Sequence, residues 1–362
     1  MNNIKITELN KEDKPSFFLN KSRVHLTVIV LMFLVSINVS AQKVLKYSDH
    51  EPFGGMRTKF LKEVFFPTIE KESNGRLKIE AYWNGELAIA YNSLHAVKVG
   101  DTVDIATVVP EYTAKELPLH QIFKSFPVGP SGERQVSFFQ RVYSEVPEFS
   151  AELNNNNIVQ IFLSTGYPLG FFSRQPLNNL KEIKGNKWRT ASFWHSDFLR
   201  NIGAIPVSMH WGPEIYKALE EKALDGIMVN VDSGFELKVY EHAPYLLTSK
   251  DLWLGHLYIV AMNKNTWNEL AEEDKGAILR AAKISYKTLG NVMDKSFDSQ
   301  MEALKKEGTT VRILNRKEVN DFQTAIKFQE VQEKWTKAQK AIGREADLVL
   351  KKVNAILYKT MK

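Results

Sequence analysis

The residue best suited to bind a ligand is an arginine within an aromatic segment. Arg189 lies in residues 185–195 (GNKWRTASFWH), and its nearest acidic neighbours in the sequence are Glu182 and Asp197. An arginine keeps its charge in proteins, so a partly buried one needs a partner. Its planar guanidinium matches a carboxylate with two parallel, charge-assisted hydrogen bonds. The predicted chemistry is therefore carboxylate recognition, and the partner is either a ligand or a distant acid such as Asp232 or Glu51.

The side chains that catalysis needs do not occur in recognisable patterns. The chain has no cysteine, which excludes disulfides, thiolate metal sites and cysteine nucleophiles. The motifs G-x-S-x-G, H-E-x-x-H, G-x-x-x-x-G-K-[ST] and G-x-G-x-x-G are absent from the sequence. The 8 histidines are scattered, and the pairs His50–Glu51 and Glu241–His242 are typical of a surface. We therefore expect neither an enzyme nor a bound metal or cofactor.

The composition indicates a large globular protein. The 362 residues are 44% hydrophobic and 25% charged, so the chain can bury one large core or two ordinary ones. The net charge of +6 comes from lysines and glutamates that alternate along most of the chain. Because no basic block is interleaved with stacking aromatics, we expect no nucleic-acid partner.

The first 41 residues have the pattern of an export signal. Lys21 and Arg23 precede an apolar run of about 14 residues, and small or β-branched residues follow at Val39 and Ala41. A membrane anchor is the alternative, but a spanning helix needs about 20 apolar residues. We predict cleavage after Ala41 and a periplasmic location.

Strand and helix patterns alternate through the rest of the chain. Predicted strands include residues 43–48, 77–83 and 102–109, with helical patterns at 56–72 and 92–100 between them. Such alternation favours a parallel α/β sheet. A second α/β block, roughly residues 166–250, interrupts the first, and a strand at 254–263 returns to it. Two lobes joined by more than one crossing can close on a ligand by a hinge.

Five segments in order resemble the solute receptors of TRAP transporters, the tripartite ATP-independent periplasmic carriers. The resemblance covers residues 43–350. It rests on the order and spacing of the five segments and not on any single motif. The segments are residues 73–88 (SNGRLKIEAYWNGELA), 96–112 (AVKVGDTVDIATVVPEY), 180–190 (LKEIKGNKWRT), 203–226 (GAIPVSMHWGPEIYKALEEKALDG) and 262–270 (MNKNTWNEL).

The resemblance implies a fold, a function and partners. The implied fold is an α/β, two-lobed periplasmic-binding-protein fold of type II, with a hinge and long C-terminal helices. Lobe I would comprise residues 42–165 and 251–294, and lobe II residues 166–250 and 295–362. A monomeric receptor would capture a small organic acid and deliver it to the small and large membrane subunits of a TRAP transporter.

The same resemblance implies residues of the ligand site. Arg189 occupies the position of the arginine that binds the ligand carboxylate in the family, and Trp211 that of a tryptophan lining the cleft. The family often has Q-E-N-P after the aspartate–glycine step, whereas this chain has IMVN at 227–230. Asn230 therefore lies one residue after the position of the family's asparagine. A shift of one residue turns a strand side chain to the other face of the sheet. Asn230 and Asp232 are candidates, and Asp232 suits a ligand hydroxyl, an amine or a cation.

One departure from the family pattern concerns the ligand's charge. Many relatives have a second arginine in a G-F-R-N-F segment, and this chain has Pro168 there. The loss favours a monocarboxylate over a dicarboxylate. Nearby aromatic and histidine side chains favour a partly apolar ligand, or are core residues instead: Tyr91, Tyr112, Tyr167, Phe193, Trp194 and His195.

Acidic residues follow two strands of the first lobe. His50 and Glu51 come after the first strand, and Glu111 precedes Tyr112 after the third. Ligands of open α/β sheets bind beyond the carboxyl ends of the strands, so these residues are further candidates, with a solvated loop as the alternative.

Two other functions remain open at this point. The same fold can feed a sensor or chemoreceptor instead of a carrier, and an exported enzyme is a more distant alternative. The C-terminal helical residues 328–357 can serve in dimerisation, but we expect them to brace the lobes.

Overall fold

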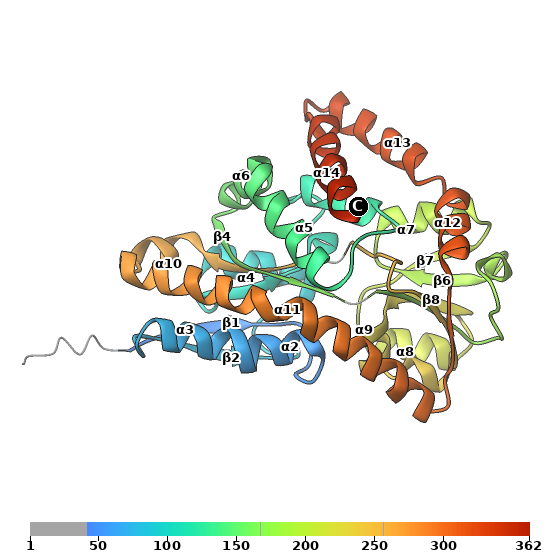
Figure 1. Ribbon diagram of the computed structural model, residues 1–362, viewed down its shortest axis with the longest axis horizontal. Helices are drawn as coiled ribbons and strands as arrows, with labels where there is room; N and C mark the ends of the chain where they lie inside the picture. Colours follow the sequence, from blue (N-terminus) through green and yellow to red (C-terminus); the bar gives the residue numbers. More distant parts are fainter. Residues whose placement is uncertain (1–41, 167, 256) are drawn as a thin grey trace, which may run out of the picture. The chain divides into compact units, whose positions relative to one another are not determined.

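The computed structural model describes residues 42–166, 168–255 and 257–362, which form two β-sheets surrounded by helices (Figure 1). The predicted export signal, residues 1–41, and Tyr167 lie outside the described residues. Across the described part of the chain, no helix combines the length and hydropathy needed to cross a membrane.

The first sheet has the strand order β2-β1-β3-β10-β4. Strands β1, β2 and β3 are parallel, while β10 runs antiparallel to both β3 and β4. Every residue of β3 and β10 is buried, as expected for central strands covered on both faces. The strands are β1 (Lys43–Ser48), β2 (Leu77–Tyr82), β3 (Ile105–Val108), β4 (Ile158–Thr165) and β10 (Leu257–Asn263).

The second sheet has the strand order β11-β9-β5-β8-β6-β7. Here β6, β7 and β8 are parallel, and β5 runs antiparallel to its neighbours β8 and β9. The strands are β5 (Leu169–Ser173), β6 (Lys187–Thr190), β7 (Ile205–Ser208), β8 (Gly226–Asn230), β9 (Tyr245–Thr248) and β11 (Thr310–Ile313).

Both sheets are mixed, so the prediction of a parallel sheet was wrong for two strands. Strands β5 and β10 are the ones that follow the two direct crossings of the chain between the sheets, whereas the later crossing from β10 to β11 passes through residues 264–306. A strand that enters its sheet directly from such a crossing starts at the edge where the parallel strands end. It therefore runs against them, because no crossover helix first returns the chain to the opposite edge.

Helices occur at both segments, 56–72 and 92–100, where the sequence pattern predicted them. The pattern at 56–72 is α2 (Met56–Phe60), a π-helical turn (Leu61–Phe65) and α3 (Phe66–Glu72). The others are α4 (Ser93–Val99), α5 (Gly132–Glu145), α6 (Pro147–Asn155), α7 (Phe193–Asn201), α8 (Pro213–Glu220), α9 (Val231–Glu236), α10 (Lys264–Glu269), α11 (Glu272–Lys306), α12 (Arg316–Ala325), α13 (Phe328–Ala341) and α14 (Ala346–Met361). Short 3-10 helices are Ala90–Asn92, Pro110–Tyr112, Leu119–Ser125, Leu180–Ile183 and Val239–Glu241.

Asparagine side chains cap the N-termini of helices α10 and α12. Asn263, the last residue of β10, accepts the N–H groups of Asn265 and Thr266 and so caps α10. Asn315 forms a reciprocal capping box with Glu318 at the start of α12.

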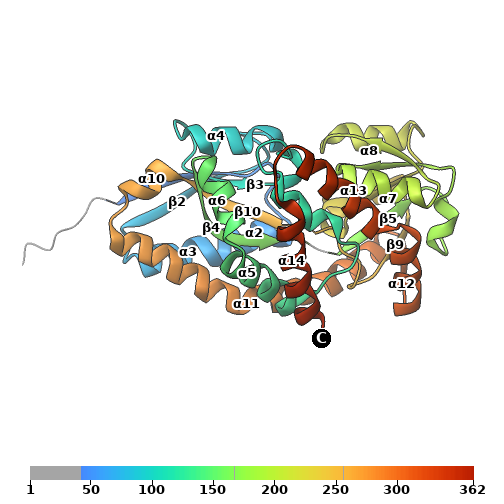
Figure 2. The same ribbon diagram turned by 90° about the horizontal axis from the view of Figure 1, so that it is seen from above.

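One long helix contacts both sheet regions. Helix α11 has 35 residues and packs on α3 and α5 beside the first sheet, and on α9 and β11 of the second (Figures 1 and 2). Near the C-terminus, α14 packs against α5 and α13 contacts α7. The predicted lobe limits remain a prediction, and α14, which they assign to lobe II, lies against a helix assigned to lobe I.

Candidate functional site

A small cavity lies where the carboxyl ends of strands from both sheets meet. The volume open to the centre of a water molecule is about 20 Å³, enough for one or two waters. On the side of the first sheet, the wall consists of His50, Glu51, Val109, Glu111, Tyr112 and Tyr258, together with Leu254 from the crossing that precedes β10. Its wall from the second sheet consists of Arg189, Thr190, Ala191, His195, Trp211, Met228, Val229 and Ser233.

Arg189 is held in the second sheet and is only 2% exposed. Its Nε and Nη2 atoms donate to the carbonyl of Met209, at 3.2 and 2.9 Å. The guanidinium also lies 5.6 Å from the centre of the Trp211 ring, within the range of a cation–π contact. No carboxylate in the described ranges forms an ion pair with it, so neither Asp232 nor Glu51 is its partner.

Close packing of the neighbouring strand positions Arg189. Trp188 precedes it and is fully buried on the other face of β6. A Cβ atom at Gly226 of β8 would lie 2.6 Å from both the Trp188 ring and the carbonyl of Phe172. Only glycine therefore fits at this point, where β8 lies between β5 and β6.

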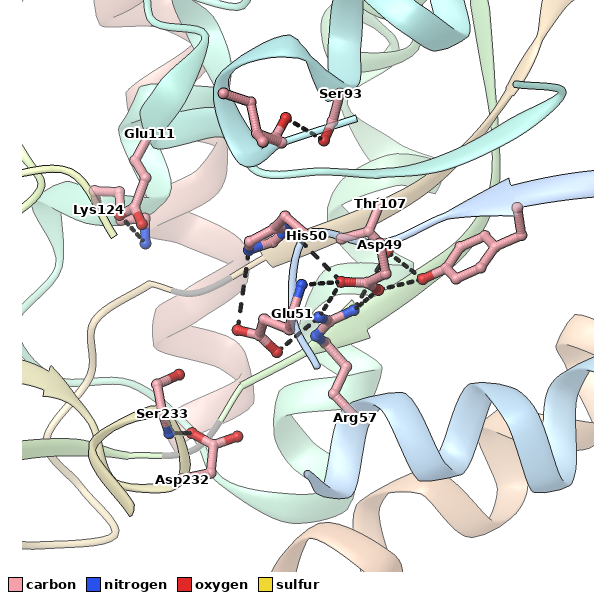
Figure 3. A network of polar contacts seen from close by, with 12 residues as sticks. Asp49, His50, Glu51, Arg57, Ser93, Thr107, Glu111, Lys124, Asp232 and Ser233 are labelled. Carbon is pink, nitrogen blue, oxygen red and sulfur yellow. Dashed lines mark hydrogen bonds and ion pairs between the residues drawn. The ribbon is translucent and has the colours of Figure 1, made fainter. Parts of the chain in front are cut away.

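A buried salt-bridge network fixes the first-sheet side of the cavity (Figure 3). Arg57, in α2, donates to both carboxylate oxygens of Asp49, at 2.6 and 2.8 Å, and to Glu51 at 2.7 Å. Tyr47 also donates to Asp49 and contacts Thr107. Burial alone would raise the pKa of Asp49, but Arg57 outweighs it and lowers that pKa to about 2. Glu51 is thus held at the cavity wall by a rigid partner.

A second buried ion pair lies near Arg189. Lys124 contacts Glu111 at 2.7 Å, and both side chains are almost fully buried. Burial opposes the charged carboxylate, but Lys124 outweighs it and the pKa of Glu111 is lowered. Burial, with the charge of Lys124, lowers the pKa of His195 to about 3. The His195 imidazole is therefore neutral at pH 7, and its Nε2 atom has no hydrogen-bond partner among the residues that the structure covers.

Two buried polar side chains lie where β8 ends and α9 begins. Asn230 is fully buried, and neither polar atom of its side chain is hydrogen-bonded within the described residues. Asp232, in α9, is 8% exposed and accepts the N–H of Ser233 at 2.9 Å. Burial and the nearby Glu51 carboxylate raise the pKa of Asp232 to about 7.

Aromatic rings connect the two sides of the cavity. Tyr91 lies in the 3-10 helix Ala90–Asn92, beside Tyr112, with ring centres 4.5 Å apart. On its other side it meets His210, which follows β7, with ring centres 4.0 Å apart. This contact joins the first-sheet wall to the loop that carries Met209 and Trp211.

The structure brings together part of the predicted site. Seven predicted residues line the cavity: His50, Glu51, Glu111, Tyr112, Arg189, His195 and Trp211. Tyr91 lies behind Tyr112, and Asn230 and Asp232 flank the wall residues Val229 and Ser233.

Two predicted aromatic residues lie away from the wall. Phe193 is 42% exposed at the start of α7, and Trp194 is fully buried against Trp335 of α13, with ring centres 5.2 Å apart. Their ligand role thus stays a prediction without support from the geometry.

Sequence reasoning missed several residues around the cavity: Asp49, Arg57, Lys124, Ser233 and Tyr258. For the first pair a signal existed, since Asp49 directly follows the predicted strand 43–48 and Arg57 lies in the first turn of the predicted helix 56–72. A metal site is not indicated, because no cluster of three His, Asp or Glu side chains suited to a metal occurs in the described ranges.

A family model matches most of the chain. The model of bacterial extracellular solute-binding protein, family 7 (DctP) matches residues 51–338. Among curated proteins, the sialic acid-binding periplasmic protein SiaP of Vibrio cholerae is 24% identical over 278 residues, 71% of this chain and 78% of its own.

Two solved structures have the same fold. A TRAP solute-binding protein from Rhodoferax ferrireducens, in complex with copurified benzoate, superposes with a TM-score of 0.77 at 21% identity. The match covers 88% of this chain and 99% of that one. A marine-metagenome TRAP solute-binding protein in complex with metahydroxyphenylacetate gives a TM-score of 0.75 at 21% identity, over 89% and 100% of the two chains. The predicted two-lobed periplasmic-binding fold is therefore confirmed.

Proposed function

Because the chain belongs to the bacterial extracellular solute-binding protein family 7, we propose that it is the exported receptor of a TRAP-type transporter and binds a small monocarboxylate through Arg189. The receptor delivers this acid to the small and large membrane subunits. The curated relatives named for a substrate are solute-binding proteins of organic acids, and the chain has no recognisable catalytic motif.

The environment of Arg189 is the observation that carries this proposal. The guanidinium is buried in the cavity wall, and its two hydrogen bonds go to one neutral carbonyl. No described residue accepts a hydrogen bond from Nη1. A buried charge without a counter-charge is costly, so a ligand carboxylate on the Nη1–Nη2 edge stabilises the site.

The other cations near the cavity support one carboxylate rather than two. Lys124 is paired with Glu111, and Arg57 is paired with Asp49 and Glu51. His195 is neutral at pH 7 because burial lowers its pKa to about 3. Among the described wall residues, Arg189 is then the one cation without an acidic partner, so a second carboxylate would meet no matching charge.

Binding requires the cavity to widen. A space of about 20 Å³ for water centres does not admit an organic acid, whereas ligand sites commonly enclose about 300–1,000 Å³. The wall residues come from two sheets joined by crossings before β5 and before β10. Hinge motion at these crossings opens the cavity, and the ligand bridges both walls when it closes.

The test is a thermal-melt screen of the purified protein with monocarboxylates, 2-oxo acids, dicarboxylates and sugar acids. A ligand at a hundred times its dissociation constant adds about 2.7 kcal/mol of stability. The screen is repeated with Arg189→Ala, with Arg189→Lys, and with Arg134→Ala at an exposed control position. Truncating one partner of a buried charge pair costs about 2–5 kcal/mol, so Arg189→Ala should weaken binding at least about 30-fold.

The variants separate the possible results. A monocarboxylate that shifts the wild type and Arg134→Ala, but not Arg189→Ala, supports the proposal. Arg189→Lys should recover only a part, because a lysine cannot form the two-pronged contact. An equal shift in the wild type and Arg189→Ala would show that Arg189 does not bind the carboxylate.

A further inference from the structure

We propose that the ligand carries a positively charged amino group besides its carboxylate, and that this group binds between Glu51 and Asp232. The inference rests on the proposed function, since it places the carboxylate on Arg189. It names the substrate class as amino acids or other amine-bearing monocarboxylates.

Glu51, in one wall of the cavity, lies opposite Asp232, which flanks Ser233 in the other wall (Figure 3). Glu51 lines the cavity from the loop after β1, and Ser233, next to Asp232, lines it from α9. The two segments approach closely here, since a Cβ atom at Gly54 would lie 3.7 Å from a carboxylate oxygen of Glu236. A group held between Glu51 and Asp232 therefore touches both sides of the closed cavity.

Asp232 has an unused carboxylate oxygen. The side chain is 8% exposed, and its Oδ1 atom accepts the N–H of Ser233. Its Oδ2 atom has no hydrogen-bond or ion-pair partner in the part of the chain described, and Figure 3 shows it turned away from Ser233. One oxygen of this largely buried side chain is therefore free to accept a hydrogen bond from a charged donor.

The surroundings of Asp232 contain more negative than positive charge. The acids nearby are Glu51 and Glu236, and the nearest cation, Arg57, already binds both oxygens of Asp49 and one of Glu51. Burial lowers the pKa of His50, which is thus neutral at pH 7. The remaining facing group, Tyr258, is neutral too, because burial raises the pKa of its hydroxyl.

This excess of negative charge contributes to the raised pKa values of two acids at the site. Burial and Glu51 raise the pKa of Asp232 to about 7, and burial and Glu51 also raise that of Glu236. An ammonium group would remove the repulsion that causes part of these shifts, whereas a hydroxyl would not. No group of three His, Cys, Asp or Glu side chains in the described residues is arranged to hold a metal ion, so an ammonium fits better than a metal ion.

The cavity is consequently polarised along its length. Arg189 supplies an unpaired positive charge from β6, and Glu51 and Asp232 supply negative charge from the β1 loop and α9. A zwitterion presents the complementary charges, and both of its ends would be desolvated and paired.

The experiment compares ligands that differ in one group. Isothermal titration of the purified protein uses leucine, 2-hydroxy-4-methylpentanoate and 4-methylpentanoate. Because the spacing of the two charges in the ligand is unknown, a second series uses 5-aminopentanoate, 5-hydroxypentanoate and pentanoate. At least one amine should bind at least about tenfold more tightly than both analogues of its series.

Variants assign the effect to the two acids. Asp232→Asn and Glu51→Gln should each reduce the ratio of the affinities for the amine and for its unsubstituted analogue at least about tenfold. Asp321→Asn, at a 60% exposed position of α12, is the matched control and should leave all affinities unchanged.

A pH series tests the protonation of Asp232 itself. With a pKa of about 7, Asp232 takes up a proton as the pH falls from 8 to 6, so the affinity for the amine should fall about tenfold. The unsubstituted acid should lack this loss, and Asp232→Asn should remove it. A purely structural role of Asp232 would not produce this difference.

The outcomes distinguish this inference from the proposed function. If unsubstituted acids bind as tightly as amines and need Arg189, the inference is overturned while the carboxylate receptor stands. If Ca²⁺ alone stabilises the wild type but not Asp232→Asn, the site is a metal site and the inference is overturned. If no amine binds, the inference is also overturned, and the Arg189 variants decide the proposed function separately.

Discussion

At the scale of single residues, pairing of charges determines what the cavity can bind. Arg57 and Lys124 are buried cations, yet each has an acidic partner within 2.7 Å. Arg189 has only the Met209 carbonyl and the Trp211 ring. The three cations are similar in burial, so their partners, not their exposure, mark Arg189 as the ligand contact.

The charged form of Asp232 should destabilise the ligand-free protein at neutral pH. Its pKa of about 7 lies above the usual 3.8, so the folded state holds the proton more firmly than the unfolded state. Stability is therefore lost as the pH rises from about 4 to 7 and stays lost above 7. Asp232→Asn removes this loss and should raise the melting temperature by a few °C at pH 8.

Calorimetry at pH 8 and pH 4 checks this expectation. At pH 4 the aspartate is protonated in the folded state and nearly as favourable as asparagine, so the difference should nearly vanish. A stabilisation of the same size at both pH values would contradict the role of the carboxylate charge.

Arg57 should be a large contributor to stability. Asp49 is fully buried, and losing Arg57 would leave its charge unpaired, which costs about 3–5 kcal/mol in comparable buried pairs. We expect Arg57→Met to lower the free energy of unfolding by this amount in urea titrations. The double variant Arg57→Met/Asp49→Asn should recover part of the loss, and no recovery would argue against the pairing.

At the scale of elements, close strand packing in the second sheet positions Arg189. Strand β6 lies between β7 and β8, and its Trp188 ring packs over the start of β8. Close packing thus explains why a glycine follows the aspartate in this segment, because any side chain at Gly226 would clash with the Trp188 ring. The position of Arg189 at the cavity depends on this contact.

Gly226→Ala should therefore disturb both folding and binding. Its Cβ atom would lie 2.6 Å from the Phe172 carbonyl and from the Trp188 ring, and such overpacking costs about 1–3 kcal/mol. We expect lower stability in urea titrations and weaker binding of the acid. Gly276→Ala in α11 is the control: it meets only the flexible Arg280 side chain at 3.0 Å and should be neutral or stabilising.

At the scale of the whole molecule, the two sheets contribute comparable walls to one cavity. The Tyr91–His210 ring contact and the approach of Gly54 to Glu236 connect the walls at two separate places. Helix α11 packs on elements of both sheet regions and so links them along one side. Ligand binding should consequently affect both walls together.

Hydrogen exchange measured by mass spectrometry tests this coupling. A bound acid should slow exchange in residues 49–55 and in residues 231–236, because it bridges the two walls. Arg189→Ala should abolish both effects at the same ligand concentration. Protection confined to one of the two segments would mean that the ligand does not bridge the walls.

The sequence by itself determined the family, the alternation of strands and helices, and the main candidate for a ligand-binding residue, Arg189. Helix and strand periodicity is local, so the helical patterns at 56–72 and 92–100 were predicted correctly, the second within one residue of each end. Arg189 stood out because its permanent charge has no acidic residue close in sequence, and Glu51, Tyr112 and Trp211 were placed from the ends of strands or from family landmarks.

Only the tertiary structure decided which of these residues meet. Trp194 and His195 are adjacent in sequence, yet one packs into the core against Trp335 and the other lines the cavity, since successive helical residues point in different directions. The reversed direction of β5 and β10 depends on where the chain enters each sheet. Glu51 and Asp232 lie far apart in the chain, and their approach, with Arg57 already occupied by Asp49, is a product of long-range packing that no local pattern records.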